Sequence, residues 1–346
     1  MTVAAPIRPA LRIGALELSS PVLIAPMVGI TDAPCRELAL ELGAGLVSTE
    51  MVASEAVVRS LDASLHLLDF RAGFGPAGAQ LVGCDPAVMA EAAQICVGRG
   101  AVTVDVNLGC PVKKVVGRGS GAALARDVYA TAAVIGAMVE AVPVPVTAKM
   151  RLGWDAQSIN APELARALAG VGVSAVTVHG RTRCQGYSGD ADWQEIARVK
   201  EAVDIPVFGS GDVEDVRLIE RRIRAGVVDG VVIARGMLGN FWVIRQAAHL
   251  LATGELIDDL DFAARMALCR RHLDMLIAYH GPQRALRIGR KYVSWSIKGC
   301  NGAARLRAMV QDLDSLDMLD TIFDLALTAG LGPQGWFRPV FTSGEG

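Results

Sequence analysis

An amide, a glycine and a thiol stand at Asn107, Gly109 and Cys110, directly after the β-branched segment Val102–Val106, which is typical of a buried strand. The carboxyl ends of strands are where α/β barrels build their catalytic sites. A thiol at such a position could donate a proton or act as a nucleophile. Because most free cysteines are small buried apolar residues, the position of Cys110, more than its type, indicates a catalytic role.

The residues after Cys110 predict a loop that could close over a substrate. Pro111 and two lysines, Lys113 and Lys114, precede three glycines that fall within five residues, and a helical pattern resumes only at Ala122. Closely spaced glycines favour a mobile loop over a helix. The two lysines could lower the pKa of the thiol or bind a phosphate group.

The elements that must position these groups alternate regularly along the chain. Eight short apolar segments separated by helical patterns predict an α/β fold, a closed (β/α)8 TIM barrel over residues 1–251. A hairpin over residues 11–18 should close the bottom of the barrel. A doubly wound open sheet is the alternative, but its G-x-G-x-x-G turn is missing after the first strand. The expected strands are Val22–Ala25, Gly45–Thr49, Gly78–Val82, Val102–Val106, Val144–Met150, Ala175–His179, Pro206–Gly209 and Gly230–Ala234.

A small all-helical domain is predicted over residues 255–335, from helical patterns at Asp261–Tyr279, Arg284–Ser296 and Ala303–Thr328. This part of the chain concentrates positive charge with few acids between. A solvated helix face is the usual reason for such a run. A face of one sign beside a barrel mouth is also what binding to a phosphate backbone requires. The basic residues are Arg284, Arg287, Arg290, Lys291, Lys298, Arg305 and Arg307.

The composition excludes several classes of protein. The 346 residues carry a formal net charge of −2, so the chain as a whole does not indicate a polyanion partner. No apolar run reaches the roughly 18–20 residues of a membrane span, and the N-terminus lacks the apolar core of a signal peptide, so we expect a cytoplasmic protein. The seven cysteines and five histidines show no metal-ligand spacing, which predicts neither a disulfide framework nor a bound metal.

Polar residues follow most of the expected strands and should share one rim of the barrel. Gly211 and Gly236 would let backbone N–H groups approach a phosphate closely, and Arg235 would add a charge-assisted hydrogen bond. Lys149 with Gln80 could bind the polar edge of an isoalloxazine ring, where positive charge stabilises the reduced form. Each of these residues has a structural explanation when taken alone. Together they predict a barrel enzyme with a phosphate-bearing, flavin-type cofactor and a loop thiol.

Five segments resemble the tRNA-dihydrouridine synthases, and specifically a bacterial branch of that family. The similarity spans the barrel and the helical domain, and the N-x-G-C-P motif with the glycine-containing loop after it is the most specific part. The segments are APMVGITDAPCR, DVNLGCPVKKVVGRGSGAAL, KMRLGW, VHGRTR and GSGD.

The resemblance implies an FMN enzyme that uses NADPH to reduce the 5,6 double bond of a uridine in tRNA. It assigns Cys110 as the proton donor, and Asn107 and Arg151 as residues that hold the uracil. The basic residues Arg284, Arg287 and Lys291 are the expected tRNA contacts. By similarity, the FMN contacts are Pro26, Met27, Val28, Gln80, Lys149, His179, Ser210, Gly211, Asp212, Ala234 and Arg235.

Two residues depart from the family pattern, and two other functions stay open. The family often has asparagine in place of Ser210 and glycine in place of Ala234, whose methyl group adds bulk near the expected phosphate. A flavin barrel that acts on a free pyrimidine or another small molecule is the main alternative, although such an enzyme would not need a basic helical domain. A non-catalytic RNA-binding protein that keeps the barrel is the third possibility.

Overall fold

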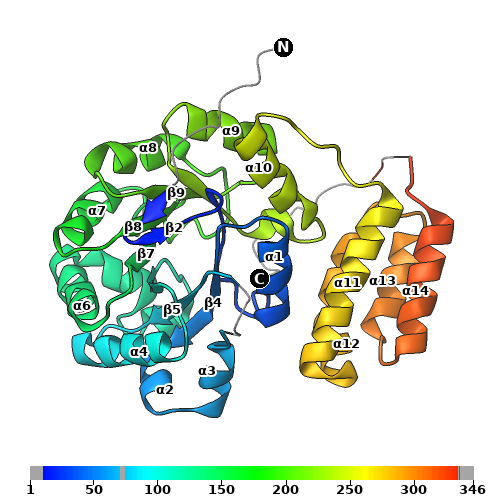
Figure 1. The fold of residues 1–346 in the computed structure, drawn as a ribbon, viewed down its shortest axis with the longest axis horizontal. Helices are drawn as coiled ribbons and strands as arrows, with labels where there is room; N and C mark the ends of the chain where they lie inside the picture. Colours follow the sequence, from blue (N-terminus) through cyan, green and yellow to red (C-terminus); the bar gives the residue numbers. More distant parts are fainter. Residues whose placement is uncertain (1–10, 71–74, 334, 336–346) are drawn as a thin grey trace.

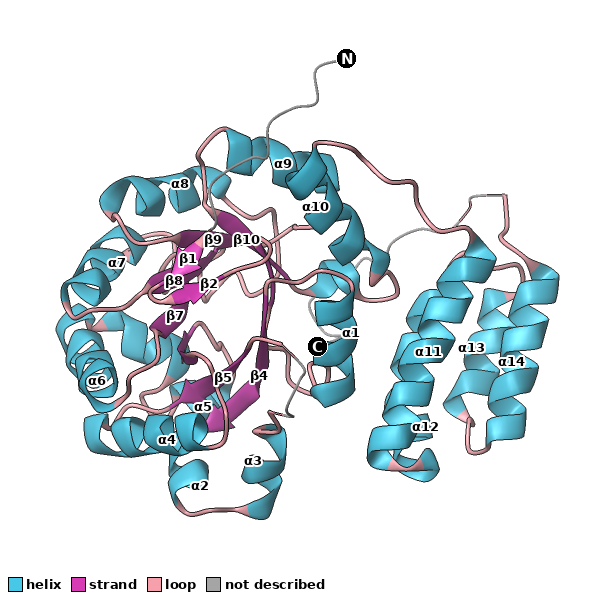
Figure 2. Ribbon diagram, viewed as in Figure 1, coloured by secondary structure: helices cyan, strands magenta, loops and turns pink. Residues whose placement is uncertain are grey.

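A computed structural model describes residues 11–70, 75–333 and 335, and its central feature is a closed barrel of eight parallel strands (Figures 1 and 2). Each strand pairs with the next one along the chain, and the last strand closes the barrel against the first. The TIM barrel predicted from the alternating pattern is therefore confirmed. The strands are β3 (Val22–Ile24), β4 (Leu46–Ala53), β5 (Ala77–Val82), β6 (Val104–Leu108), β7 (Val146–Arg151), β8 (Ala175–His179), β9 (Val207–Ser210) and β10 (Gly230–Ile233).

Helices surround the strands and cover their outer faces (Figure 2). Aspartates cap five of them at the N-terminus: the side chains of Asp32, Asp85, Asp127, Asp192 and Asp215 accept hydrogen bonds from backbone N–H groups of the first turn. These caps fix where each helix starts after its strand. The helices are α1 (Ala33–Glu41), α2 (Ser54–Val58), α3 (Asp62–Leu67), α4 (Pro86–Gly98), α5 (Lys113–Val116), α6 (Val128–Ala141), α7 (Ala161–Gly170), α8 (Trp193–Ala202), α9 (Val216–Arg224) and α10 (Trp242–Thr253), with 3-10 turns η1 (Gly121–Arg126) and η2 (Arg235–Met237).

The predicted hairpin is present and closes the amino-terminal end of the barrel. Its strands, β1 (Arg12–Ile13) and β2 (Leu16–Glu17), pair antiparallel. Ile13 is 1% exposed and packs in an apolar cluster with Leu23 and Phe208 inside the barrel. With this end closed, ligands can reach the barrel interior only from the carboxyl ends of the strands.

Four helices follow the barrel and lie together beside α1 (Figure 1), which confirms an all-helical C-terminal region. They contact the loop between β3 and α1: Tyr292 Oη donates to Ile30 O at 3.0 Å, and His280 Nε2 lies 2.9 Å from Asp32 Oδ2. The helices are α11 (Phe262–His280), α12 (Pro282–Ser296), α13 (Ala303–Gln311) and α14 (Leu316–Ala329).

Two local predictions around Cys110 were wrong. Strand β6 continues to Leu108 instead of ending at Val106, so Asn107 lies within the strand and pairs with Lys149 of β7. The segment after Cys110 is also not wholly irregular, because it contains the single helical turn α5 and the 3-10 turn η1. Hydrogen bonds to the neighbouring strand and within the turns set the end of β6 and form the short helical turns. A local sequence pattern does not reveal these bonds.

No helix within the described residues is long and apolar enough to cross a membrane. Residues 1–10 and 71–74 of the expected barrel domain (1–251) and residue 334 of the expected helical domain (255–335) lie outside the described part of the chain.

Candidate active site

The carboxyl ends of five strands surround a cavity of about 120 Å³. Nine of the eleven residues expected to contact a flavin line it, from the last residues of β7, β8 and β9 and from the loops that follow β3, β9 and β10. Residues that the sequence places at different strand ends therefore line one cavity. The nine are Pro26, Met27, Lys149, His179, Ser210, Gly211, Asp212, Ala234 and Arg235.

The other two expected contacts lie elsewhere. Val28 is 68% exposed, on the outer side of the β3–α1 loop. Gln80 is 0% exposed inside the barrel, where its amide nitrogen donates to Asp105 at 2.7 Å and its amide oxygen accepts from Asn107 at 2.8 Å. One amide hydrogen and one lone pair of Gln80 stay unused by these bonds.

The turn after β9 leaves no space for a side chain at Gly211. Gly211 has a φ of +108°, and a Cβ there would lie 2.7 Å from the Cβ of Ala191 and 3.0 Å from Cδ2 of His179. At the end of the next strand, a Cβ on Gly236 would lie 2.4 Å from Val213 O. Gly211 therefore packs against two side chains and Gly236 against the backbone of Val213, so neither position can take a side chain without displacing a neighbour.

Replacing Gly211 with alanine should weaken cofactor binding. The left-handed backbone costs about 1–2 kcal/mol with a Cβ present, and the contact with His179 would push that ring into the cavity. We expect the affinity for the flavin that the resemblance implies to fall by about tenfold or more, measured by fluorescence titration with FMN. Gly302→Ala is the matched control, since its φ of +70° carries the same backbone cost but its Cβ would meet nothing within 4 Å. Equal FMN affinities in the two variants would show that the turn at Gly211 has no part in binding the cofactor.

Positive charge concentrates around the cavity. Burial and, to a smaller extent, the neighbouring Arg151 together lower the pKa of Lys149 to about 8, although Asp105 opposes the shift. No hydrogen bond or ion pair joins the ammonium of Lys149 to any residue in the described ranges. Burial, together with Lys149 and three arginines, also holds the pKa of His179 well below its ordinary value, so its imidazole is neutral near pH 7. A buried cation without a partner beside a neutral imidazole suits an anionic ligand.

Asp212 has a structural role in the same rim. Its carboxylate accepts hydrogen bonds from Arg181 Nη2 at 2.8 and 2.9 Å and from the backbone N–H of Ala191 at 2.7 Å. The side chain of Asp212 therefore holds the loop after β8 against the turn after β9. What this residue can still offer a ligand is its backbone, which has a φ of 50°.

Cys110 is half-buried and its loop is fixed by Asn107. The amide oxygen of Asn107 accepts from the backbone N–H groups of Gly109 at 3.1 Å and Cys110 at 2.8 Å. On the other side, Gly121 has a φ of +60°, and a Cβ on it would lie 3.2 Å from Cβ of Cys110. The thiol thus sits on a backbone that is held from two directions.

Sequence reasoning missed the way in which Arg151 and Tyr187 join the two loops at this rim. Arg151 donates from Nε to Gly109 O at 2.8 Å and from Nη1 to Gly186 O at 2.8 Å, so it ties the Cys110 loop to the loop after β8. The ring of Tyr187 lies 4.3 Å from the guanidinium carbon of Arg235 and 5.6 Å from that of Arg151. Tyr187 stands eight residues beyond the end of β8, where a rule based on strand ends does not look.

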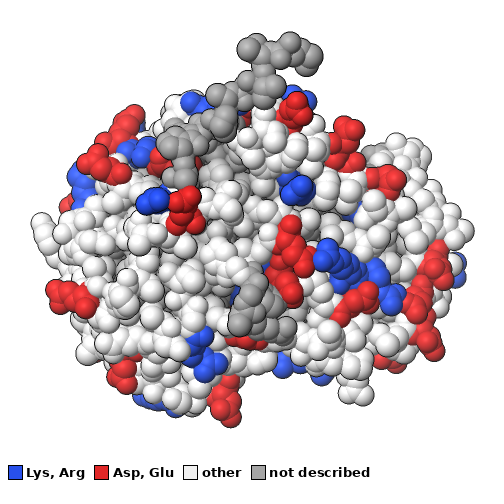
Figure 3. Space-filling view, viewed as in Figure 1, with Lys and Arg blue, Asp and Glu red and all other residues white. Residues whose placement is uncertain are grey.

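The basic residues of the C-terminal helices differ in what they contact. Arg284 and Arg287 on α12 are exposed. Lys291 instead donates to Gly29 O, and Arg290 donates to Leu313 O at 2.8 Å, so both hold the protein together. Figure 3 shows Asp and Glu side chains beside Lys and Arg on this side of the molecule, so the positive charge is local.

A sequence model of the family described as dihydrouridine synthase (Dus) matches residues 23–327. A probable tRNA-dihydrouridine synthase of Rickettsia conorii is 43% identical over 304 residues, 87% of this chain and 91% of the relative. The tRNA-dihydrouridine synthase B of Xanthomonas axonopodis pv. citri is 38% identical over 327 residues, 93% of this chain and 98% of the relative. Among solved structures, an old yellow enzyme homologue from Zymomonas mobilis is similar with a TM-score of 0.53 and 12% identity, covering 74% of this chain and 95% of that one, which is a similarity of fold alone.

Proposed function

The chain belongs to the dihydrouridine synthase family, and from this premise we propose that it uses FMN and NADPH to reduce the C5=C6 bond of specific uridines in tRNA. Family membership makes it a tRNA-dihydrouridine synthase. The observation that best supports the cofactor assignment is the cavity at the strand ends, which nine of the expected flavin contacts line.

The residues around this cavity fit a phosphate-bearing flavin. The turns at Gly211 and Gly236, with Arg235 beside them, would hold the phosphate through backbone N–H groups and one guanidinium. Lys149 would hold the polar edge of the ring, because its buried ammonium has no partner within the described residues. Bound FMN, reduced by NADPH, supplies the hydride for C6 of the uracil.

The residues of this chain would then complete the reduction. Asn107 keeps one amide hydrogen free, which can donate to a uracil carbonyl as negative charge develops on it. The Nη2 hydrogens of Arg151 are not used by its bonds to the two loops and can donate to the same ring. The S–H of Cys110 gives its proton to C5 and leaves a thiolate, which solvent reprotonates.

The test is direct. Purified protein should carry FMN and should form dihydrouridine in unmodified tRNA with NADPH, measured by mass spectrometry of the digested nucleosides. Free uracil and uridine serve as parallel substrates. Reduction of the free pyrimidines at a rate equal to that of tRNA would favour the small-molecule alternative, and a protein that binds tRNA but takes up no flavin would favour a non-catalytic role.

We further propose that residues 255–335 form a tRNA-binding domain. The target base must leave its stack, which costs roughly a few kcal/mol, and contacts with the phosphate backbone can offset that cost. Arg284 supports this proposal, since it is exposed and lines a cavity of about 330 Å³ between the β3–α1 loop and α12. Lys291 contacts that loop already, so its substitution would disturb the junction as well as any phosphate contact.

Replacing both Arg284 and Arg287 with alanine should weaken tRNA binding mainly at low salt. Each lost phosphate contact should reduce the slope of log K against log salt by about 0.7–0.9, so the double variant should lose up to about 1.8. Filter binding over a salt series measures this slope. Arg198→Ala with Arg224→Ala is the control, because it removes the same charge from the outer helices α8 and α9. A slope unchanged from that of the wild type would show that these arginines of α12 do not contact the tRNA phosphates.

A further inference from the structure

We propose that Asp105 is a positioning residue for uridine reduction, one that acts on the Cys110 loop through Gln80 and Asn107. This inference rests on the proposed function. A continuous line of hydrogen bonds carries it. Asp105 Oδ2 accepts from Gln80 Nε2 at 2.7 Å, Gln80 Oε1 accepts from Asn107 Nδ2 at 2.8 Å, and Asn107 Oδ1 accepts from the Cys110 backbone N–H at 2.8 Å.

An ionised Asp105 fixes the orientation of the amide groups of Gln80 and Asn107. An ionised carboxylate only accepts hydrogen bonds, so Gln80 must turn its NH2 group toward Asp105 and its carbonyl oxygen toward Asn107. Asn107 then presents its NH2 group to Gln80 and keeps its oxygen for the Cys110 loop. The second hydrogen of that NH2 group makes Asn107 a donor toward the pocket, which suits a substrate carbonyl and repels a substrate donor.

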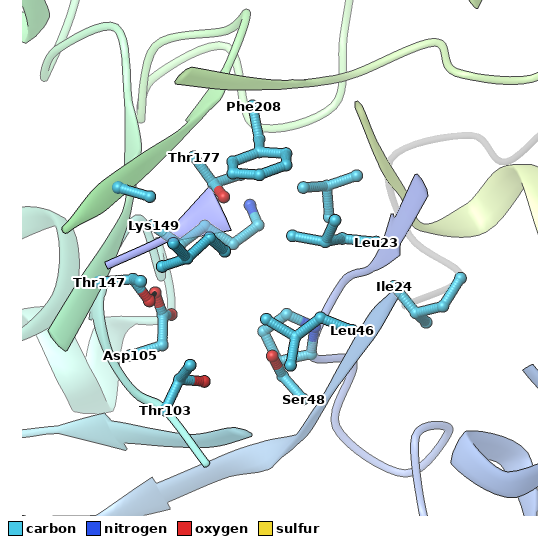
Figure 4. A pocket seen from close by; sticks show the side chains of 14 residues that line it. Leu23, Ile24, Leu46, Ser48, Thr103, Asp105, Thr147, Lys149, Thr177 and Phe208 are labelled. Carbon is cyan, nitrogen blue, oxygen red and sulfur yellow. Dashed lines mark hydrogen bonds between the residues drawn. The ribbon is translucent and has the colours of Figure 1, made fainter. Parts of the chain in front are cut away.

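The strand register explains how these side chains meet. Gln80 pairs with Asp105 across β5 and β6, and Asp105 pairs with Thr147 across β6 and β7, so the three lie in one layer. Thr147 Oγ1 donates to Asp105 Oδ1 at 2.7 Å. Figure 4 shows these two side chains next to each other. Asn107 stands two residues after Asp105 and therefore faces the same interior, one layer closer to the rim.

The barrel does not need a carboxylate at this place. Barrel interiors are usually filled by Val, Ile and Leu. Here Asp105, Thr147 and Lys149 line a small cavity of about 30 Å³ whose other walls include apolar side chains such as Leu23 and Phe208 (Figure 4). Burial raises the pKa of Asp105, against the bonds from Gln80 and Thr147 and the charge of Lys149, so an ionised carboxylate at this place costs stability. An apolar residue in place of Asp105 would avoid the cost of burying a carboxylate. A functional role for its hydrogen bond to Gln80 explains why the carboxylate is present.

The test compares three variants. Asp105→Ala removes the acceptor and frees the amide of Gln80, and it should lower kcat for tRNA by about 10- to 100-fold at saturating FMN with little change in KM. Asp105→Asn keeps an oxygen for Gln80 and can donate to the Thr147 hydroxyl, so it should rescue most of kcat. Thr147→Val is the matched control: it also removes one hydrogen bond from Asp105, but on the side away from the Cys110 loop.

Alkylation of Cys110 by iodoacetamide gives a second readout that does not depend on turnover. We expect its rate to change in Asp105→Ala and to stay near the wild-type rate in Thr147→Val, at matched melting temperatures. Equal kcat in the alanine and valine variants would overturn the inference, and so would failure of Asp105→Asn to rescue. If the alanine variant does not fold, turnover and alkylation in the asparagine variant decide, and loss of either overturns it.

The two proposals can fail separately. A wild-type protein that reduces no tRNA would refute the proposed function, while the alkylation rates would still report whether Asp105 positions the Cys110 loop.

Discussion

Replacing Cys110 with alanine is expected to leave FMN bound and reducible by NADPH but to slow dihydrouridine formation in tRNA by about 10²–10⁴-fold, the usual contribution of a general acid. The thiol lies outside the cavity that the expected flavin contacts line, so its loss should not affect the cofactor. Asn107 would still hold the loop, because its bonds reach the backbone of residue 110 and not the side chain. Stopped-flow flavin reduction and dihydrouridine yield measure the two half-reactions separately.

Cys184→Ala is the control for this result, since Cys184 is also a free thiol on a loop at the same end of the barrel and is exposed. It should retain wild-type turnover. A Cys110→Ala variant that turns over at the rate of Cys184→Ala would remove the thiol from the reaction, and loss of flavin in Cys110→Ala would show that the loop supports the cofactor site instead.

The positions of the strands and of the rim residues could be predicted because both follow from periodicity. In a barrel of parallel strands, every carboxyl end faces the same side, so a polar residue after a strand must lie near the others. Lys149, His179 and Arg235 stand far apart in the sequence and line one cavity for this reason. The hairpin at the bottom was predictable for a similar reason, since two short apolar pairs around Gly14 can only bury Ile13 inward.

The hydrogen-bond partners could not be predicted, because they depend on register and on side-chain direction. The sequence predicts a loop at Asn107, but β6 extends to Leu108, and this register turns the amide of Asn107 toward Gln80. Lys291 looked like a free cation on a basic helix, but the packing of α12 against the β3–α1 loop places its ammonium on Gly29 O. Sequence gives the residue type and approximate place, and the fold decides whether a polar group remains free for a ligand.

Replacing Lys149 with methionine should weaken FMN binding and at the same time stabilise the flavin-free protein. A charge-assisted hydrogen bond contributes about 1.5–3 kcal/mol, so the loss should be about 10- to 150-fold in affinity. Lys149 is buried with its pKa lowered to about 8, which corresponds to a cost on the order of 3 kcal/mol for keeping the ammonium charged in the folded chain. Methionine has a similar volume and no charge, so it removes that cost.

The stability of the flavin-free protein and its affinity for FMN should both change with pH as Lys149 loses its proton. In the folded flavin-free protein Lys149 loses its proton near pH 8, whereas in the unfolded chain it keeps the proton to about pH 10.4. The unfolded chain therefore binds more protons between these values, and wild-type stability should rise with pH across that window. FMN affinity should fall over the same rise in pH, because the cation that binds it is lost. Lys149→Met should show neither change, in urea titrations and in FMN titrations from pH 7 to pH 10.

Lys200→Met separates this effect from a general response to losing a lysine. Lys200 forms an ion pair with Asp229 at 2.8 Å on the outer side of the barrel, so its replacement should lower stability and leave FMN affinity unchanged. If Lys149→Met bound FMN as tightly as Lys200→Met does, the ammonium would have no part in holding the cofactor. A flavin-free Lys149→Met protein less stable than the wild type at pH 7 would show instead that the buried charge is compensated inside the barrel, by Asp105, without any ligand.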